Sequence, residues 1–343
     1  MAILILIIGI SLLILIHEFG HFWVARRMGL WVEEFGIGFP PRLFAKKVGE
    51  TIWSINALPF GGFVRIHGEK PELEAEAGKI VDSGRSFANL SVGRRALIIV
   101  AGVIMNFFLG WLLVSAVYAV GVPQKVVIQS VGANTPAAVA GLLPGDILSD
   151  FNSVDVFTEY VQSSKGKEIQ IIIERNGEKL MLAGTPRVEV PEGEGPLGVS
   201  LTEFGQQKLP LVQSLVEGLK TSVQILLAII VSLWTLVIGL FTGGAVMENF
   251  VGPVGIFQIA NESARFGLVN LLQLIGLISL NLVVLNVLPI PALDGGRLFF
   301  LLIEKIKRSP ITVRREATAN AIGFVLLLLL MVFITVRDVV KIF

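Results

Sequence analysis

Three ionisable residues interrupt an apolar N-terminal run, and their spacing is typical of a metal site. The first sixteen residues carry no charged side chain, and the HExxH motif His17 to His21 follows before the apolar run has ended. On a helix, residues four apart share a face, so His17 and His21 can reach one ion. Zinc suits this pair because it binds neutral imidazole and keeps one open position in catalytic sites. Glu18 lies about 100° around the helix, where it can accept a proton from water.

A zinc hydrolase needs a third protein ligand, and the sequence offers two candidates. His67 is the remaining histidine, and it lies between Arg65 and Glu69 in a charged segment. Asp294 instead follows an uncharged apolar run, within the stretch PIPALDGG. Prolines there loosen the helix, and the two glycines allow another element to approach closely. We therefore expect Asp294 as the third ligand and Zn²⁺ as the cofactor.

Composition indicates a membrane protein. Of 343 residues, 53% are hydrophobic and 16% are charged, which is more apolar than a soluble globular protein. The net charge of +1 gives no reason to expect a nucleic-acid partner, and the absence of cysteine excludes disulfides and thiolate ligands. The N-terminal run lacks a basic flank and a small-residue cleavage site, so we expect it to be retained as a span.

Four windows are long and apolar enough to cross a bilayer, which takes about 20 residues. They cover residues 1–25, 96–120, 266–288 and 317–336. Basic residues cluster in the linker between the first two windows and in the linker between the last two: Arg26, Arg27, Lys46, Lys47, Arg94, Arg95, Lys305, Lys307, Arg308, Arg314 and Arg315. By the positive-inside rule both linkers are expected in the cytoplasm, with residues 122–210 outside.

A fifth apolar segment, residues 221–247, is uncharged up to Met247 and is long enough to span. A fifth crossing, however, would place Asp294 and the basic linker after it outside the cell, against the charge rule. The preceding residues mix Gln213, Glu217 and Lys220 into the apolar pattern, as an interfacial helix does. We therefore expect residues 211–247 to form helices that lie on, or dip into, the outer leaflet.

The exterior segment predicts a compact β-rich domain. The stretches KVVIQSV and EIQIIIERNGEKLML are strand-like, and Asn176-Gly177 marks a hairpin turn in the second. Between them, GANTPAAVAGLLPGDILSDFN resembles the pattern of PDZ domains, in which a helix of small residues precedes a Gly-Asp turn into a strand. We expect one PDZ-like domain.

Together these motifs resemble the bacterial site-2 proteases of the RseP type. The HExxH motif, AGVIMNF, the PDZ-like insert, FVGPVGI and NVLPIPALDGG appear in the family's order and cover essentially the whole chain. The resemblance implies an intramembrane zinc endopeptidase. It assigns His17, His21 and Asp294 as zinc ligands and Glu18 as the catalytic base.

The resemblance also implies how a transmembrane substrate is held. Residues 33–66 are rich in glycine and aromatic residues and resemble the family's membrane re-entrant β-hairpin. An edge strand there would pair with the unwound substrate, with Gly36 and Gly38 as predicted contacts. Asn281 and Asn286 are expected to hold the substrate backbone near zinc, and the alternative is that they satisfy polar groups between helices.

The predicted fold class is a polytopic α-helical membrane protein with about four transmembrane helices, a re-entrant β-hairpin and one β-rich extracytoplasmic PDZ-like domain. The expected parts are an N-terminal catalytic part, the PDZ-like domain, an outer-leaflet helical region and a C-terminal catalytic part. They cover residues 1–121, 122–205, 206–262 and 263–343.

The predicted function is cleavage of single-span membrane proteins in the bacterial inner membrane, with the lipid bilayer as the surroundings of the site. By resemblance, substrates are anti-sigma factors already trimmed outside, and signal-peptide remnants. The PDZ-like domain is expected to act as a steric gate, with peptide capture as the alternative. Two other functions remain open: a zinc protease for cytoplasmic, non-spanning substrates, and a non-enzymatic PDZ scaffold with structural zinc. The open position that HExxH with Asp294 leaves for water argues against the scaffold.

Overall fold

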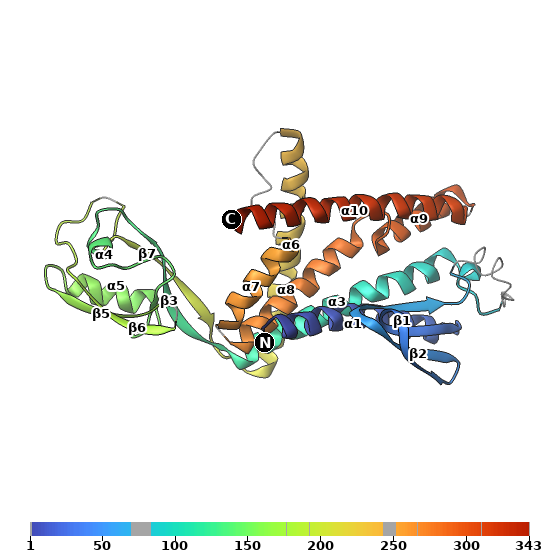
Figure 1. The fold of residues 1–343 in the computed structure, drawn as a ribbon, viewed down its shortest axis with the longest axis horizontal. Coiled ribbons are helices and arrows are strands. Elements are labelled where there is room, and N and C mark those ends of the chain that lie inside the picture. The colour runs from blue at the N-terminus through green and yellow to red at the C-terminus, as the bar shows by residue number, and fades with distance from the viewer. Residues whose placement is uncertain are drawn as a thin grey trace. The chain divides into compact units, whose positions relative to one another are not determined.

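The chain forms two compact units, which are described separately. The computed structural model describes residues 2–69, 84–175, 177–191, 193–242, 252–265, 267–309 and 311–342. The first unit comprises residues 1–116 and 212–343, and the second comprises residues 117–211. The first is built from long helices and a β-hairpin, and the second from a β-sheet with short helices (Figure 1).

Long apolar helices make up most of the first unit. Five helices in the described ranges have the length and apolar composition needed to cross a membrane. They are α1 (Ala2–Arg27), α3 (Val92–Val120), α6 (Leu211–Thr242), α8 (Leu268–Val287) and α10 (Val313–Ile342). The shorter elements are η1 (Phe87–Asn89), α7 (Pro253–Arg265) and α9 (Asp294–Lys307). Four of the long helices, α1, α3, α8 and α10, coincide with the four predicted windows.

Helix α6 is the segment that the sequence analysis places on the outer leaflet. It is one continuous helix of 32 residues, so the prediction of helix is confirmed. Its length and composition also suit a span, which gives five candidate spans where the sequence predicts four. Residues 243–251, with the beginning of the FVGPVGI motif, lie outside the described residues. The position of α6 on the leaflet stays a prediction.

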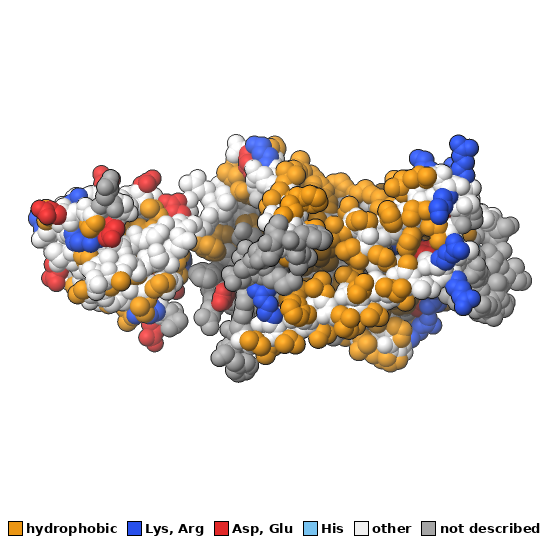
Figure 2. All heavy atoms as spheres, turned by 90° about the horizontal axis from the view of Figure 1, so that it is seen from above, with side chains coloured by type: hydrophobic (Ala, Val, Ile, Leu, Met, Phe, Trp, Pro, Cys, Tyr) orange, Lys and Arg blue, Asp and Glu red, His pale blue; other side chains and the backbone are white. Residues whose placement is uncertain are grey.

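Charged residues on the first unit are separated from its apolar surface. Arg26 and Arg27 end α1, and Lys305 and Lys307 lie in the last turn of α9. Figure 2 shows a broad hydrophobic surface on this unit, with most of its visible Lys and Arg side chains gathered at one end. Such a boundary between apolar surface and basic residues is typical of a helix bundle in a bilayer.

A β-hairpin follows α1, in the segment where the sequence predicts one. Its strands are β1 (Val32–Val48) and β2 (Thr51–Ile66), joined by a tight turn across which Val48 pairs with Thr51. The prediction of a hairpin is therefore confirmed. Its re-entrant position in the membrane stays a prediction.

The hairpin is folded back on itself, so that part of each strand pairs with two stretches of the other. The first half of β1 lies between two stretches of β2, because Phe35 pairs with Val64 on one side and with Trp53 on the other. The second half of β1 pairs only with the first half of β2. Residues 62–66 are therefore one edge of this small sheet, and residues 42–48 are the other.

Hydrophobic contacts hold the base of the hairpin against the helices. A buried cluster joins the end of α1, both hairpin strands, η1, α3 and α9: Ala25, Leu30, Val32, Ile66, Phe87, Ile98, Ile99 and Leu301. The ring of Phe22 also packs against Phe35 and Trp53, with centroids 5.5 and 5.3 Å apart. This packing fixes edge 62–66 beside the helix that carries the HExxH motif.

The second unit is an antiparallel sheet with the strand order β6-β5-β4-β3-β7. Its strands are β3 (Val122–Val131), β4 (Ile147–Leu148), β5 (Ile169–Arg175), β6 (Glu178–Gly184) and β7 (Val199–Gln206), with helices α4 (Pro136–Val139) and α5 (Val154–Ser163). The predicted strands and the β5–β6 hairpin are confirmed. The predicted turn residue Asn176 lies outside the described residues.

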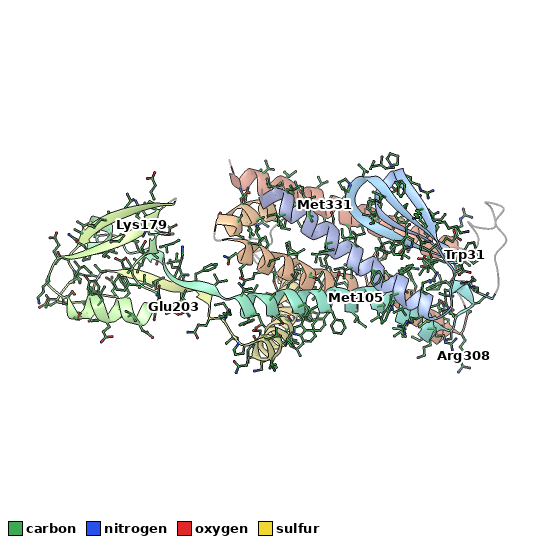
Figure 3. All side chains as sticks on the ribbon, turned by 90° about the horizontal axis from the view of Figure 1, so that it is seen from below. Trp31, Met105, Lys179, Glu203, Arg308 and Met331 are labelled. Atoms are coloured by element: carbon green, nitrogen blue, oxygen red, sulfur yellow. The ribbon has the colours of Figure 1, made fainter. Side chains whose placement is uncertain are left out.

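The small-residue helix and the Gly-Asp turn also form as the sequence predicts. Thr135 caps α4 through its side chain, and the turn at Gly145-Asp146 leads into β4. Asp146 is buried and forms a salt bridge with Arg175 at 2.7 Å. Lys179 and Glu203, labelled in Figure 3, mark exposed positions on β6 and β7. The assignment of this unit as a PDZ-like domain stays a prediction.

Candidate active site

Helix α1 brings three side chains of the HExxH motif to one place. His17 and His21 are 9% and 8% exposed, and their Nε2 atoms lie 3.2 Å apart. One helical turn separates the two residues, so both rings leave α1 on the same face, as the spacing predicts. Their rings meet edge to face, with centroids 4.8 Å apart. Glu18, the next residue, lines a cavity beside them.

Asp294 is the first residue of α9 and reaches the two histidines from the C-terminal part of the chain. Its Oδ2 lies 3.0 Å from Nε2 of His17 and 3.4 Å from Nε2 of His21. The glycines after it are needed for the turn itself. A Cβ at Gly295 would lie 2.1 Å from the carbonyl oxygen of Leu288, and one at Gly296 would lie 2.3 Å from that of Ile290. The sequence predicts that another segment approaches these glycines closely. In the structure that segment is the backbone of Leu288 and Ile290.

The three ligand atoms have the separations that a tetrahedral zinc site requires. Bonds of about 2.0–2.1 Å to zinc place two tetrahedral ligand atoms about 3.3 Å apart. The measured separations of 3.0, 3.2 and 3.4 Å agree with this value. Oδ2 of Asp294 is buried and takes part in no hydrogen bond within the described part of the chain. These residues therefore fit a zinc ion.

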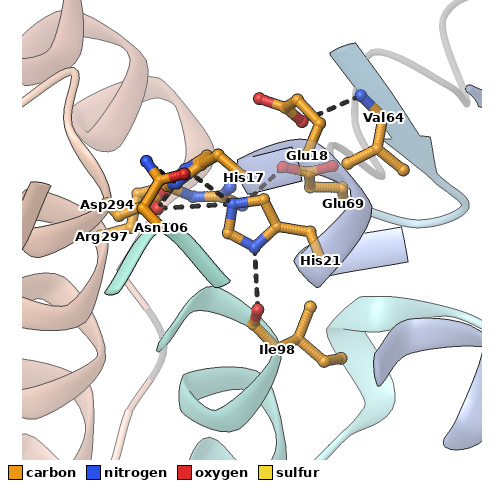
Figure 4. A network of polar contacts seen from close by, with 9 residues as sticks. All are labelled: His17, Glu18, His21, Val64, Glu69, Ile98, Asn106, Asp294 and Arg297. Carbon is orange, nitrogen blue, oxygen red and sulfur yellow. Dashed lines mark hydrogen bonds and ion pairs between the residues drawn. The ribbon is translucent and has the colours of Figure 1, made fainter. Parts of the chain in front are cut away.

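The hydrogen bond of His21 to α3 favours metal binding. Nδ1 of His21 lies 2.8 Å from the carbonyl oxygen of Ile98. A carbonyl oxygen only accepts, so Nδ1 must carry the proton and donate it. In the neutral ring this leaves the lone pair on Nε2, the atom that faces His17 and Asp294 (Figure 4).

Glu18 is tied to the edge of the hairpin. Its Oε2 accepts a hydrogen bond from the backbone N–H of Val64 at 3.1 Å. Both residues line a cavity of about 220 Å³ that also contains His21 and Asp294. A strand edge, a carboxylate and a candidate metal site therefore share one cavity.

A charged pair, Arg297 and Glu69, lines part of the same cavity. Nη2 of Arg297, one turn after Asp294 on α9, lies 2.6 Å from Oε1 of Glu69. Burial alone would lower the pKa of Arg297, but the charges of Glu69 and Asp294 outweigh burial and raise that pKa. The guanidinium therefore stays charged in the cavity. The sequence analysis did not identify Arg297 as a site residue.

His67 does not join the metal group. Its Nδ1 lies 3.0 Å from Oε1 of Glu33, and its ring packs against Trp31 with centroids 4.9 Å apart. Among the described residues, the group that could hold a metal consists of His17, His21 and Asp294. The structure thus favours Asp294 over His67, as the sequence does.

The predicted substrate contacts lie on different elements. Gly36 is in the interior of the folded hairpin, paired with Phe63 on one side and with Ser54 on the other. Its backbone is paired on both sides and cannot add a further strand, whereas residues 62–66 pair with β1 on one side. Asn281, in α8, donates a hydrogen bond to the carbonyl oxygen of Leu277 at 3.0 Å. Asn286 is half-buried on the same helix, and Gly38 is buried in β1. Their contact with substrate stays a prediction.

The sequence analysis missed two groups that contact the site, the N–H of Val64 and the carbonyl oxygen of Ile98. It includes Asn106 within the AGVIMNF motif but assigns it no role, and Nδ2 of Asn106 lies 3.4 Å from Nδ1 of His17. Backbone groups leave no trace in residue types. Asn106 did offer a signal, because it is a polar residue inside an apolar span.

Comparison with known proteins identifies the family of the chain. Residues 5–330 match peptidase family M50. Zinc metalloprotease RasP of Shouchella clausii is 31% identical, with 97% of each chain covered. RasP of Geobacillus kaustophilus is 30% identical over 98% of this chain and 97% of its own. The regulator of sigma-W protease RasP of Bacillus subtilis is 29% identical over 98% of each chain.

The resemblance to site-2 proteases is therefore confirmed, and with it zinc as the cofactor and proteolysis as the activity. The apolar helices agree with a multi-pass membrane protein. The chain is a membrane zinc metalloprotease that belongs to peptidase family M50.

Proposed function

We propose that this protease cuts transmembrane segments, with His17, His21 and Asp294 as zinc ligands and Glu18 as the general base. The observation that carries the proposal is a cavity lined by Glu18, His21, Asp294 and a strand edge, with His17 in the same group of ligand atoms as His21 and Asp294. A hydrolase needs a metal, a base and a means of holding an extended peptide. The cavity offers a candidate for each.

Zinc bound to the three ligands supplies a Lewis acid for the peptide carbonyl and lowers the pKa of water. Glu18 accepts the proton of the attacking water and passes it to the leaving nitrogen. The carbonyl carbon gains a C–O bond and loses its C–N bond, and Glu18 returns to its starting state. Because Val64 holds Oε2, the other carboxylate oxygen, Oε1, is the one available for proton transfer.

The substrate is proposed to bind as an added strand at edge 62–66. A transmembrane helix hides its peptide bonds, and it must unwind before any of them can be cut. An unwound segment has free N–H and C=O groups, which cost several kcal/mol each in lipid if they stay unpaired. Pairing with edge 62–66 satisfies part of them and brings the segment beside Glu18.

Single-span membrane proteins are the proposed substrate class. The name of the Bacillus subtilis relative, regulator of sigma-W protease, points to anti-sigma factors as the substrates here. Signal-peptide remnants have the same form, a short apolar helix with one free end. In both cases the lipid bilayer surrounds enzyme and substrate.

The proposed setting is the bacterial inner membrane, with the active site near the cytoplasmic side. The positive-inside rule supports this orientation, because basic residues end both α1 and α9. The second unit then lies outside the cytoplasm. We assign it as a PDZ-like domain that acts as a gate, excluding substrates with bulky exterior domains, and peptide capture is the alternative.

The variant Glu18→Gln tests this mechanism. It removes the base and spares all three ligands, so purified protein should still bind about one zinc while cleavage of a single-span substrate is lost. Variants His17→Ala, His21→Ala and Asp294→Ala should instead lose zinc affinity. Normal cleavage by Glu18→Gln would refute the assignment of Glu18 as the base. Loss of cleavage with zinc retained would argue against a purely structural role for zinc.

A further inference from the structure

One face of α3 contacts both candidate zinc-binding histidines. Ile98, Gly102 and Asn106 are spaced four residues apart, so they share a face of the helix. Ile98 accepts a hydrogen bond from His21 through its backbone, and the Asn106 amide lies 3.4 Å from Nδ1 of His17. A Cβ on Gly102 would lie 2.6 Å from Nε2 of His21 and 2.8 Å from Cε1 of His17. Gly102 thus lets α3 approach α1 closely, and this places Ile98 and Asn106 beside the histidine rings.

We propose that Asn106 is a positioning residue, whose side-chain oxygen accepts a hydrogen bond from Nδ1–H of His17. The carbonyl oxygen of Ile98 makes the same bond with His21. Both rings are then neutral, with the proton on Nδ1 and the lone pair of Nε2 facing the metal. The inference rests on the proposed function, in which His17 binds zinc.

The two possible orientations of the Asn106 amide differ in their consequence for His17. With Nδ2 facing Nδ1, the amide donates, and the proton of the neutral ring must sit on Nε2. A proton on Nε2 would use the lone pair that a bond to zinc requires. A half-turn about Cβ–Cγ exchanges Nδ2 and Oδ1 without changing the shape of the side chain, and Nδ1 can then donate.

When Nε2 of His17 binds zinc and Nδ1 carries the proton, satisfaction of the buried polar atoms favours the half-turn. Asn106 is 1% exposed, and its Oδ1 has no hydrogen-bond partner in the described part of the chain. If His17 carries its proton on Nδ1, the present orientation leaves that N–H, Oδ1 and Nδ2 all unpaired. The half-turn pairs Oδ1 with Nδ1–H and leaves only Nδ2. Each buried polar group without a partner costs about 1–3 kcal/mol, so the half-turn is preferred.

The backbone at Asn106 is held from α8, which limits how far the side chain can shift. Oγ of Ser279 donates to the carbonyl oxygen of Asn106 at 2.8 Å, and Ser279 is fully buried. The amide is therefore presented to His17 from a fixed helix position. Removal of this single side chain should affect the metal site without unpacking α3 and α8.

Zinc affinity of the full chain in detergent tests the inference. We expect Asn106→Leu, which has similar size but no acceptor, to weaken zinc binding about 10–100-fold. Asn106→Asp keeps an oxygen acceptor and should bind zinc nearly as wild type does. Asn270→Leu is the matched control. Asn270 is a buried asparagine of α8. Its neighbour Leu271 packs with Leu6, which lies three turns before His17 on α1. Asn270→Leu should therefore keep wild-type affinity for zinc.

A spectroscopic measurement tests the hydrogen bond itself, even if Asn106→Asp does not fold. The chain has three histidines, so labelling with ¹⁵N-histidine gives few signals. In the zinc-loaded wild type, Nδ1 of His17 should carry a proton that exchanges slowly with water, and in Asn106→Leu this proton should exchange faster. An unprotonated Nδ1 in wild type would overturn the inference.

The affinity results separate this inference from the proposed function. If His17→Ala weakens zinc binding but Asn106→Leu does not, only the inference fails. If His17→Ala leaves zinc binding unchanged, the proposed metal site itself fails. Equal losses in Asn106→Leu and Asn106→Asp, or in Asn106→Leu and Asn270→Leu, would also overturn the role assigned to the oxygen of Asn106.

Discussion

Glycines on both helices let α1 and α3 approach each other at the metal group. A Cβ at Gly20 would lie 2.5 Å from the carbonyl oxygen of Ala101, and one at Gly102 would touch both histidine rings. Distances below 3.0 Å cannot be accommodated without movement, and backbone is the hardest part to move. The metal site is therefore sensitive to single methyl groups at these positions.

Gly102→Ala should disturb the histidines directly. Its methyl group would lie 2.6 Å from Nε2 of His21, so the ring must turn or the helices must separate. We expect zinc binding about tenfold weaker or worse, measured by competition with a chelator. Gly93→Ala is the control on the same helix, because nothing lies within 4 Å of its Cβ. Wild-type zinc affinity in Gly102→Ala would contradict the close contact.

The residues of the candidate metal group could be predicted from residue types, whereas their contacts with α3 could not. The HExxH spacing gives His17 and His21, and Asp294 stands out as a carboxylate at the end of an apolar run. The bond from His21 to Ile98 crosses 77 positions of the chain, and the contact from Asn106 to His17 crosses 89. Such contacts depend on how two helices cross, which no local pattern determines.

At the scale of elements, edge 62–66 is tested by removing one N–H group. Val64→Pro deletes the donor to Glu18, a bond to a charged group worth about 1.5–3 kcal/mol, and proline is tolerated at strand edges. We expect kcat/KM for a single-span substrate to fall about tenfold or more, with zinc binding unchanged.

Val64→Ala is the matched control, because it shortens the side chain and keeps the N–H group. It should cleave at nearly the wild-type rate. If both variants lose activity equally, the side chain of Val64 matters and its backbone does not, which would contradict the role of its N–H group in holding Glu18.

Element types were largely predictable, but their pairing was not. The lengths of the apolar runs predicted α1, α3, α8 and α10, and a segment rich in glycine and aromatic residues predicted the hairpin. The fold-back of β1 and β2 escaped prediction because it depends on a series of register shifts within one hairpin. Only this fold-back decides that residues 62–66, and not Gly36, form the edge beside Glu18.

At the scale of the whole molecule, excision of the second unit tests the proposed gate. Val122 pairs with Gln206 at the ends of β3 and β7, and the N–H of Leu209 donates to the carbonyl oxygen of Tyr118 at 2.9 Å. Paired residues lie about 5 Å apart, so a two-residue Gly-Ser linker can join Val122 to Gln206. The excised enzyme should cut an untrimmed substrate, and it should cut a trimmed one about as before.

Capture of a peptide C-terminus predicts the opposite result for the same variant. Cleavage of the trimmed substrate would then be lost, because its new C-terminus would have no binding site. Zinc content checks that the excised chain still folds. The excised Glu18→Gln variant shows that any new cleavage comes from this enzyme.

The strand edge beside Glu18 has a consequence for how cleavage sites are encoded. In the proposed strand addition, affinity comes from main-chain hydrogen bonds, which every residue except proline can make, and side chains contribute only through pockets beside the strand. What differs between membrane segments is the free energy needed to melt a few residues of helix in lipid, where Leu and Ala resist and Gly and Pro yield. Susceptibility to this protease is then a mechanical property of the substrate: a weak point in a helix marks the place of the cut.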